Sequence, residues 1–252
     1  MSAARRKRNR YRRRGRFGFI YKLLAVIAVV GALFVGATVF FRVQTIAVSG
    51  AQRYTDQQVI EASGAVLGSN LFALNKFDMA AQIRRQLPYV EGVNIRRGLP
   101  DTLHIAVTET IAAAVVDSAD GRWLISRSGK MLEQAGADAN AMVITGLNAV
   151  QPEAGAMMLV QESDSTRQDS MLAVLQSLHS CGLLGEVTSM DLRSPAYVML
   201  QLGERFTVKL PASGDFDYLL GAMNATIEKL EPYESGVLDL TAKDYTVVFS
   251  PA

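Results

Sequence analysis

Cysteine and histidine are scarce in this chain of 252 residues. Cys181 is the single cysteine, so no disulfide can form within the chain. The two histidines, His104 and His179, stand far apart, and no group of Cys and His residues has the spacing of metal ligands. Glycine-rich phosphate loops and a Ser/His/Asp arrangement are also missing from the sequence. We therefore expect no metal, no cofactor, no small-molecule substrate and no enzymatic activity.

Acidic residues are absent from residues 1–22, which carry ten lysines and arginines. The rest of the chain holds 16 basic residues against all 24 acids, a net charge of −8. Clustered arginines can neutralise the phosphates of nucleic acid. A cationic flank that fixes membrane topology and touches anionic lipid headgroups explains the same residues with fewer assumptions. We therefore expect a basic cytoplasmic tail over 1–22 that contacts lipid and binds no nucleic acid.

Charge of either sign is missing from Leu23 to Phe41, a run of nineteen residues. As a helix rising ~1.5 Å per residue, the run would be about 28 Å long, close to the ~30 Å hydrocarbon core of a bilayer. It is apolar on every face, which favours a transmembrane helix over a helix buried in a protein core. The positive-inside rule then places the basic tail in the cytoplasm and the body outside the cytoplasm. The sequence predicts a single-pass protein of the cytoplasmic (inner) membrane with its span at 23–41.

A cleaved signal peptide is the competing interpretation of this apolar run. Val35 and Ala37 provide small side chains of the kind that signal peptidases require. The run is longer than an ordinary signal core, however, and it continues past that position to Phe41. We expect the segment to be retained as an anchor.

Residues 43–111 show the alternation of short strands and helices expected of a small α+β domain. A strand from Val43 is stopped by Ser49-Gly50, and Thr55 with Gln58 has the pattern of a capping box at the start of a helix. A second helix is predicted from about Asp78 to Pro88, followed by two strands on either side of a turn that contains Pro100. The predicted order is β-α-α-β-β.

Residues 112–252 predict a second α+β domain with a mixed sheet and two covering helices. Its helices are expected at about Asp169–Gly182 and 215–230, and its last strand at Tyr245–Phe249. No spacing forces any two of its acids together as a catalytic pair, so we assign structural roles to these candidates: Asp191, Asp215, Asp217 and Asp239.

The segment Pro88–Thr110, PYVEGVNIRRGLPDTLHIAVTET, resembles the end of the POTRA domain in the bacterial FtsQ/DivIB cell-division family. Upstream, Val43–Thr55 is similar to the first strand of that domain and Gly68–Asn75 to the segment between its helices. POTRA domains also occur in outer-membrane assembly and two-partner secretion. One POTRA domain directly after an N-terminal anchor is the FtsQ/DivIB arrangement.

The resemblance implies a non-enzymatic scaffold of the divisome, located at the division septum, that helps to regulate septal peptidoglycan synthesis. Its implied partners are the single-pass coiled-coil proteins FtsB (DivIC in other lineages) and FtsL. The alternative is a POTRA component that handles polypeptides in a secretion or assembly system.

The resemblance further implies that the last strand pairs with a segment of FtsB. Such pairing completes the open row of backbone donors and acceptors on an edge strand. Asp239-Leu240 fits the family pattern, but Thr241 and Ala242 stand where Arg and Tyr are frequent. We therefore expect a contact made mainly by the backbone of these five residues: Tyr245, Thr246, Val247, Val248 and Phe249.

Overall fold

The computed structural model describes residues 16–137, 139–242 and 246–252, and of residues 16–18, 34 and 37–39 only the backbone. Its first element is the helix α1, Arg16–Phe40. A search of the described residues finds no helix long and apolar enough to cross a membrane. The transmembrane segment at 23–41 therefore remains a prediction, and most of the basic tail lies outside the described residues.

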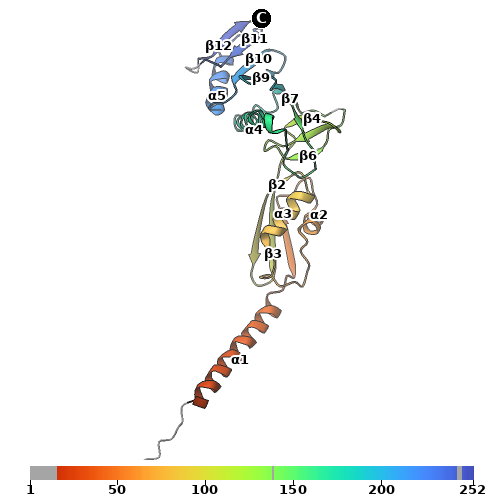
Figure 1. Cartoon of the computed structure of the whole chain (residues 1–252), viewed down its shortest axis with the longest axis vertical. Coiled ribbons are helices and arrows are strands. Elements are labelled where there is room, and N and C mark those ends of the chain that lie inside the picture. Colours follow the sequence, from red (N-terminus) through yellow and green to blue (C-terminus); the bar gives the residue numbers. More distant parts are fainter. Residues whose placement is uncertain (1–15, 138, 243–245) are drawn as a thin grey trace, which may run out of the picture. The chain divides into compact units, whose positions relative to one another are not determined.

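A three-stranded sheet with two helices follows, in the predicted order β-α-α-β-β. Its elements are β1 (Thr45–Ser49), α2 (Asp56–Ser63), α3 (Lys76–Gln86), β2 (Val90–Gly98) and β3 (Thr102–Glu109). The strands lie in the order β1-β3-β2. The central strand is thus β3, which comes last in the sequence of this domain (Figure 1).

Local sequence explains where these helices begin and end. Thr55 accepts a hydrogen bond from the Gln58 amide, and the Gln58 side chain reaches back to the Thr55 amide, so the predicted capping box is confirmed. Gly64 ends α2 in the left-handed conformation with φ 65°. Asn75, not the region of Asp78, caps α3, because its side chain accepts from the Phe77 amide.

A nine-stranded mixed sheet forms most of the remaining chain, with the strand order β12-β11-β10-β9-β8-β7-β4-β5-β6. β7 is parallel to both of its neighbours, and β10 is parallel to β11. The strands are β4 (Ala114–Ser118), β5 (Gly121–Ile125), β6 (Met131–Gln134), β7 (Met142–Ala149), β8 (Val187–Asp191), β9 (Tyr197–Leu202), β10 (Phe206–Pro211), β11 (Gly236–Asp239) and β12 (Val248–Pro251).

Two helices, α4 (Ser165–Ser180) and α5 (Phe216–Ile227), lie side by side and pack their apolar residues into the core of this sheet. A short 3₁₀ helix, Glu162–Asp164, leads into α4. The helical contribution to the core consists of Met171, Val174, Leu175, Leu178, Phe216, Leu219, Leu220 and Met223. Burial of these side chains is the main favourable contribution to folding here, since the chain can form no internal disulfide.

Two further sequence predictions need correction. The helix predicted from Asp169 begins at Ser165, directly after the short 3₁₀ helix Glu162–Asp164. The last strand, predicted at Tyr245–Phe249, is Val248–Pro251, and Tyr245 lies outside the described residues.

By the contacts within the chain, the protein divides into two compact units. One contains α1 and the residues up to Ala47, together with Val66–Leu74 and Arg96–His104. The other contains Val48–Ala65, Asn75–Ile95 and Ile105–Ala252.

Candidate functional site

The two edges of the nine-stranded sheet differ in what covers them. At β6, Met131 donates its amide to Ala156 at 2.8 Å and accepts from the Gly155 amide at 2.9 Å, so a loop covers that edge. At the other edge β12 pairs with β11 alone among the strands of the described chain (Figure 1). An uncovered edge offers backbone donors and acceptors to another chain. Within the residues that the structure describes, β12 is therefore the open edge of this sheet.

Two hydrogen bonds show which backbone groups of β12 face outward. The Ala252 amide, just after β12, donates to the carbonyl of Ser235, just before β11, at 2.9 Å. The Gly236 amide of β11 points to the opposite side and donates to the carbonyl of Arg205, just before β10, at 3.0 Å. Backbone groups of successive strand residues point to opposite sides. Val248 and Ser250 therefore direct their backbone groups at β11, and the N–H and C=O of Phe249 point away from the sheet.

Pro251 is two residues after Phe249, so its backbone carbonyl also points away from the sheet. Proline has no N–H, and at an outward position of an edge strand the missing donor removes no hydrogen bond from the sheet. The open edge of β12 therefore offers one donor, the Phe249 amide, and two acceptors, the carbonyls of Phe249 and Pro251.

The side chains of β12 divide between the core and the solvent. Phe249 lies opposite the fully buried Leu238 and packs against the core. Val248 lies on the other face and is 49% exposed, and Val237 on the same face of β11 is 42% exposed. One apolar side chain thus fixes the strand to the sheet, while two valines form a small exposed apolar pair beside the open edge.

The predicted site residues occupy different positions in this geometry. Val248 and Phe249 lie in β12, Val247 is partly buried against the core just before the strand, and Thr246 is exposed. The prediction omitted Ser250 and Pro251, which belong to the strand. The apolar, β-prone run at Tyr245–Phe249 predicted the strand, and that run ends before Ser250.

Asp239, the last residue of β11, accepts hydrogen bonds at the start of the segment that leads to β12. Its Oδ1 accepts from the Thr241 amide at 2.9 Å and from the Thr241 hydroxyl at 2.6 Å, and its Oδ2 lies 3.3 Å from Lys209 Nζ. Burial acts to raise the pKa of this carboxyl, but the hydrogen bonds from Thr241 and Lys209 outweigh it and lower the pKa. Thr241 thus holds the Asp239 side chain in place through its amide and its hydroxyl.

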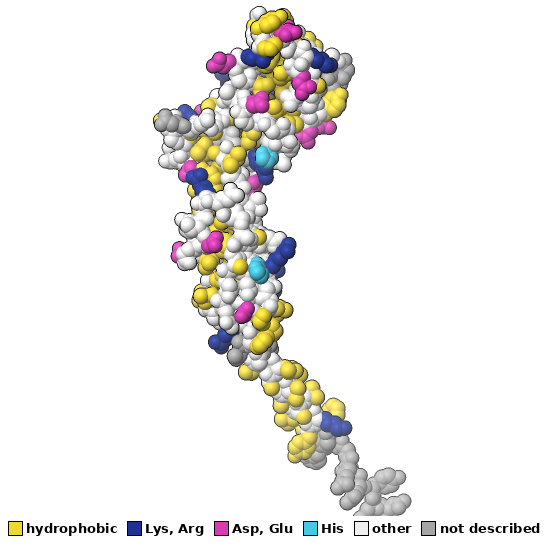
Figure 2. Space-filling view, turned by 180° about the vertical axis from the view of Figure 1, so that it is seen from behind, with side chains coloured by type: hydrophobic (Ala, Val, Ile, Leu, Met, Phe, Trp, Pro, Cys, Tyr) yellow, Lys and Arg dark blue, Asp and Glu magenta, His cyan; other side chains and the backbone are white. Residues whose placement is uncertain are grey.

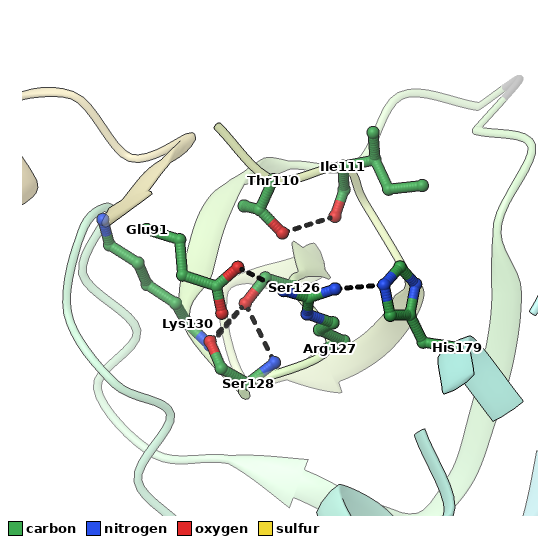
Figure 3. A network of polar contacts seen from close by, with 8 residues as sticks. All are labelled: Glu91, Thr110, Ile111, Ser126, Arg127, Ser128, Lys130 and His179. Carbon is green, nitrogen blue, oxygen red and sulfur yellow. Dashed lines mark hydrogen bonds and ion pairs between the residues drawn. The ribbon is translucent and has the colours of Figure 1, made fainter. Parts of the chain in front are cut away.

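A second polar network, within the larger unit, ties residues of the first α+β domain to the loop between β5 and β6 (Figure 3). Lys130 Nζ donates to the backbone carbonyls of Arg84 at 2.6 Å and Val90 at 2.8 Å, near the C-terminal end of α3. A cation is favoured there because the carbonyls at a helix C-terminus carry partial negative charge. Lys130 is 5% exposed, and burial, followed by repulsion from Arg84, lowers its pKa to about 8.

Beside Lys130, the Glu91 carboxylate lies 3.5 Å from the guanidinium of Arg127, and Arg127 also donates to His179 Nε2 at the end of α4 (Figure 3). Glu91 Oε2 is buried without a hydrogen bond in the described structure. This network links three elements, and no spacing in the sequence marked its residues as partners. Its contacts hold these segments of the chain together.

Comparison with known proteins identifies the class first. Residues 41–110 match the family described as "POTRA domain, FtsQ-type". These residues include all five elements of the three-stranded domain, β1, α2, α3, β2 and β3. Residues 41–110 therefore form a POTRA domain.

The chain is also similar to bacterial cell-division proteins. The chain is 38% identical to the cell division protein FtsQ of Corynebacterium glutamicum over 113 residues, 45% of this chain and 49% of that protein. It is 32% identical to DivIB of Clostridium acetobutylicum over 94 residues, 37% of each chain. FtsQ of Streptomyces venezuelae is 27% identical over 207 residues, 81% of this chain and 71% of that protein.

The match spans about half of the first of these relatives and just over a third of the second. The chain is similar to cell-division proteins of the FtsQ/DivIB family, as the sequence resemblance indicated. Proteins of this family are generally non-enzymatic structural division proteins.

Proposed function

We propose that this protein is a membrane-anchored scaffold of the divisome, which binds an extended segment of an FtsB/DivIC-like protein along β12 and associates with an FtsL-like protein. The observation that carries the proposal is the difference between the two sheet edges. β6 is covered by residues Gly155 and Ala156, whereas β12 lies at the open end of the sheet in the described structure.

The geometry of β12 defines what such a partner segment must supply. Opposite the Phe249 amide it needs a carbonyl, and opposite the carbonyls of Phe249 and Pro251 it needs amide donors. A partner strand without proline at those positions fulfils this requirement. Next to the exposed pair of Val237 and Val248, an apolar or β-branched partner side chain would bury surface on both sides.

Anchoring through α1 is the second half of the proposal. The uncharged run at 23–41 falls almost entirely within this helix, and the hydrophobic side chains that Figure 2 shows along it are exposed, from Leu23 at 50% to Leu33 at 68%. Such side chains are stable in contact with lipid and costly in water. The arginine-rich tail would then lie in the cytoplasm, and the POTRA domain and large sheet outside it.

A topology reporter tests the anchor. A reporter enzyme that is active only outside the cytoplasm, fused after Ala252, should be active, and the mature protein should retain its N-terminal tail. A mature protein that begins near Thr38 would show that the apolar run is a cleaved signal.

Imaging tests the assignment to the divisome. A fluorescent fusion of the full chain should form a band at midcell, where septal wall synthesis takes place. Uniform membrane fluorescence in dividing cells would favour the alternative, a POTRA component that handles polypeptides in secretion or assembly.

A further inference from the structure

Four large apolar side chains are exposed on two loops of the smaller unit. They are Val66 at 67%, Leu67 at 62%, Phe72 at 53% and Leu99 at 64%. The first three lie in the segment between α2 and α3, and Leu99 lies in the turn between β2 and β3. Apolar side chains grouped in this way on a surface usually mark a contact with a partner or a membrane. We call them the loop surface.

Both loops are hydrogen-bonded to the residues that directly follow α1. The Leu71 amide donates to Phe41 at 2.8 Å, and the Phe41 ring meets the Phe72 ring edge-on with centroids 5.1 Å apart. The other loop is connected a few residues later, because the amide of Gln44 donates to the Asp101 carbonyl at 2.8 Å. The loop surface is therefore linked to the end of the uncharged run.

Arg97 fixes the longer loop in this position. Its Nε donates to the Leu71 carbonyl at 2.7 Å, and its Nη2 donates to the Leu74 carbonyl at 2.9 Å. Leu71 itself is fully buried, whereas the neighbouring Phe72 points outward. The exposure of Phe72 thus results from a fixed loop conformation in which one residue anchors the loop and the next is displayed.

The charge around the loop surface differs from that of the rest of the body. The stretches 41–47, 66–74 and 96–104 contain three arginines, Arg42, Arg96 and Arg97, and one acid, Asp101. Residues 23–252 as a whole carry a net charge of −8, with 16 basic residues against 24 acids. Arginine beside aromatic and aliphatic side chains is the combination that favours the interface of an anionic bilayer.

We propose that the loop surface rests on the outer leaflet of the membrane, with Val66, Leu67, Phe72 and Leu99 at the level of anionic lipid headgroups. The inference depends on the proposed function in one respect, that α1 crosses the bilayer. If α1 does so, Phe41 lies at the membrane–water interface, and Phe72, in contact with it, lies there as well. Lipid is then the nearest apolar medium that can cover these side chains.

The experiment uses the full chain, reconstituted in vesicles of phosphatidylcholine with phosphatidylglycerol. Single cysteines are introduced as Leu67→Cys or Leu99→Cys on a Cys181→Ala background and labelled with a fluorophore whose emission reports polarity. Leu159→Cys is the matched control, because Leu159 is 59% exposed, close to the value for Leu67, but belongs to the larger unit. Leu33→Cys reports on α1 itself.

Labels at 67 and 99 should emit at shorter wavelength than the label at 159, and spin labels on lipid headgroups should quench them more strongly. The label at 33 should be quenched by spin labels placed deep in the acyl chains. If 67 and 99 behave as 159 does while 33 is quenched, the loop surface does not touch lipid and this inference is wrong. If 33 is also unquenched, α1 does not span the bilayer, and the anchoring proposal fails together with it.

The contribution of charge is tested separately with Arg96→Gln, since Arg96 is exposed. Quenching of the label at 67 should rise when phosphatidylglycerol is added to phosphatidylcholine vesicles, and this rise should be smaller in the variant. Quenching that does not depend on phosphatidylglycerol would overturn the assignment to anionic lipid.

Discussion

Phe249 of β12 lies opposite Leu238 of β11, and its ring meets that of Phe206 on β10 edge-on, with the centroids 6.3 Å apart. The edge strand is thus fixed to the core through the same residue whose N–H and C=O point away from the sheet. A partner strand would find this backbone already extended and in place, so that pairing costs little conformational entropy on this side.

Proline substitution should separate the two sides of β12. Val248→Pro removes an N–H directed at β11 and should detach the strand, lowering the free energy of unfolding by about 3 kcal/mol. Val247→Pro changes a residue just before the strand whose N–H does not face β11 and is not one of the open-edge groups of β12, so it should leave both the sheet and partner binding intact. Urea unfolding of the full chain in micelles, with binding measured on an immobilised FtsB/DivIC-like protein, compares the two.

This geometry is contradicted if the effects of the two proline variants on folding are exchanged. If Val248→Pro folds normally and Val247→Pro unfolds the sheet, the outward and inward residues have been assigned the wrong way round.

Gly236→Ala should displace β12 from the sheet. A Cβ at Gly236 would lie 2.2 Å from the backbone oxygen of Ser250, and neither strand can yield without losing its pairing. Gly203→Ala is the control, because φ is +54° there but nothing lies within 4 Å of the added carbon. We expect Gly203→Ala to cost about 1 kcal/mol of stability and to keep partner binding, and Gly236→Ala to lose binding at least tenfold. Equal binding by both variants would show that β12 is not the contact.

Because of Lys130, the free energy of unfolding should increase with pH in mildly alkaline solution. Its folded pKa is about 8, against 10.5 for the free side chain, so between these values the unfolded chain binds the additional proton. The free energy of unfolding therefore increases with pH over this range, by about 2 kcal/mol between pH 8 and 10. Above about pH 10 the opposite effect of Tyr89 begins, since its pKa is raised to about 12 by burial and by its hydrogen bond to Glu133.

The Lys130→Met variant isolates this effect, because every other titrating group remains. Urea unfolding of both proteins at pH 8 and pH 10 should give a larger increase for the natural chain than for the variant. Parallel pH profiles would mean that Lys130 is not held as a buried cation.

The basic tail should tolerate a change that preserves its charge. If it only sets topology and touches lipid, replacing half of its arginines by lysine keeps the favourable attraction to anionic headgroups, about 1 kcal/mol per residue. Cell length in a strain that depends on the variant should then be normal. Filamentous cells would instead show that the guanidinium groups recognise a specific cytoplasmic partner.

Much of the POTRA domain could be predicted from local signals. The capping box of Thr55 and Gln58 and the alternation of Leu103, Ile105 and Val107 depend on neighbours within a few residues, and all of them are found. The hairpin of β9 and β10 has a local signal of the same kind, since buried and less buried residues alternate along both strands on either side of Gly203.

Two strands of the large sheet were missed for a common physical reason. β4 follows an alanine-rich stretch, and its residues Ala114, Val115 and Val116 are all buried, so it shows no alternation. β8 contributes few apolar residues and is held by its neighbours on both sides. Long-range pairing determines both strands, and a local pattern does not contain that information.

Hydrogen exchange at single residues of β12 tests the central claim most directly. The full chain in micelles is compared with and without a saturating FtsB/DivIC-like partner. Pairing along the open edge should slow exchange of the Phe249 amide at least tenfold, while the amides of Val248 and Ser250, directed at β11, change much less. If the partner binds and exchange at Phe249 is unchanged, the partner does not add a strand to β12 and the account is wrong.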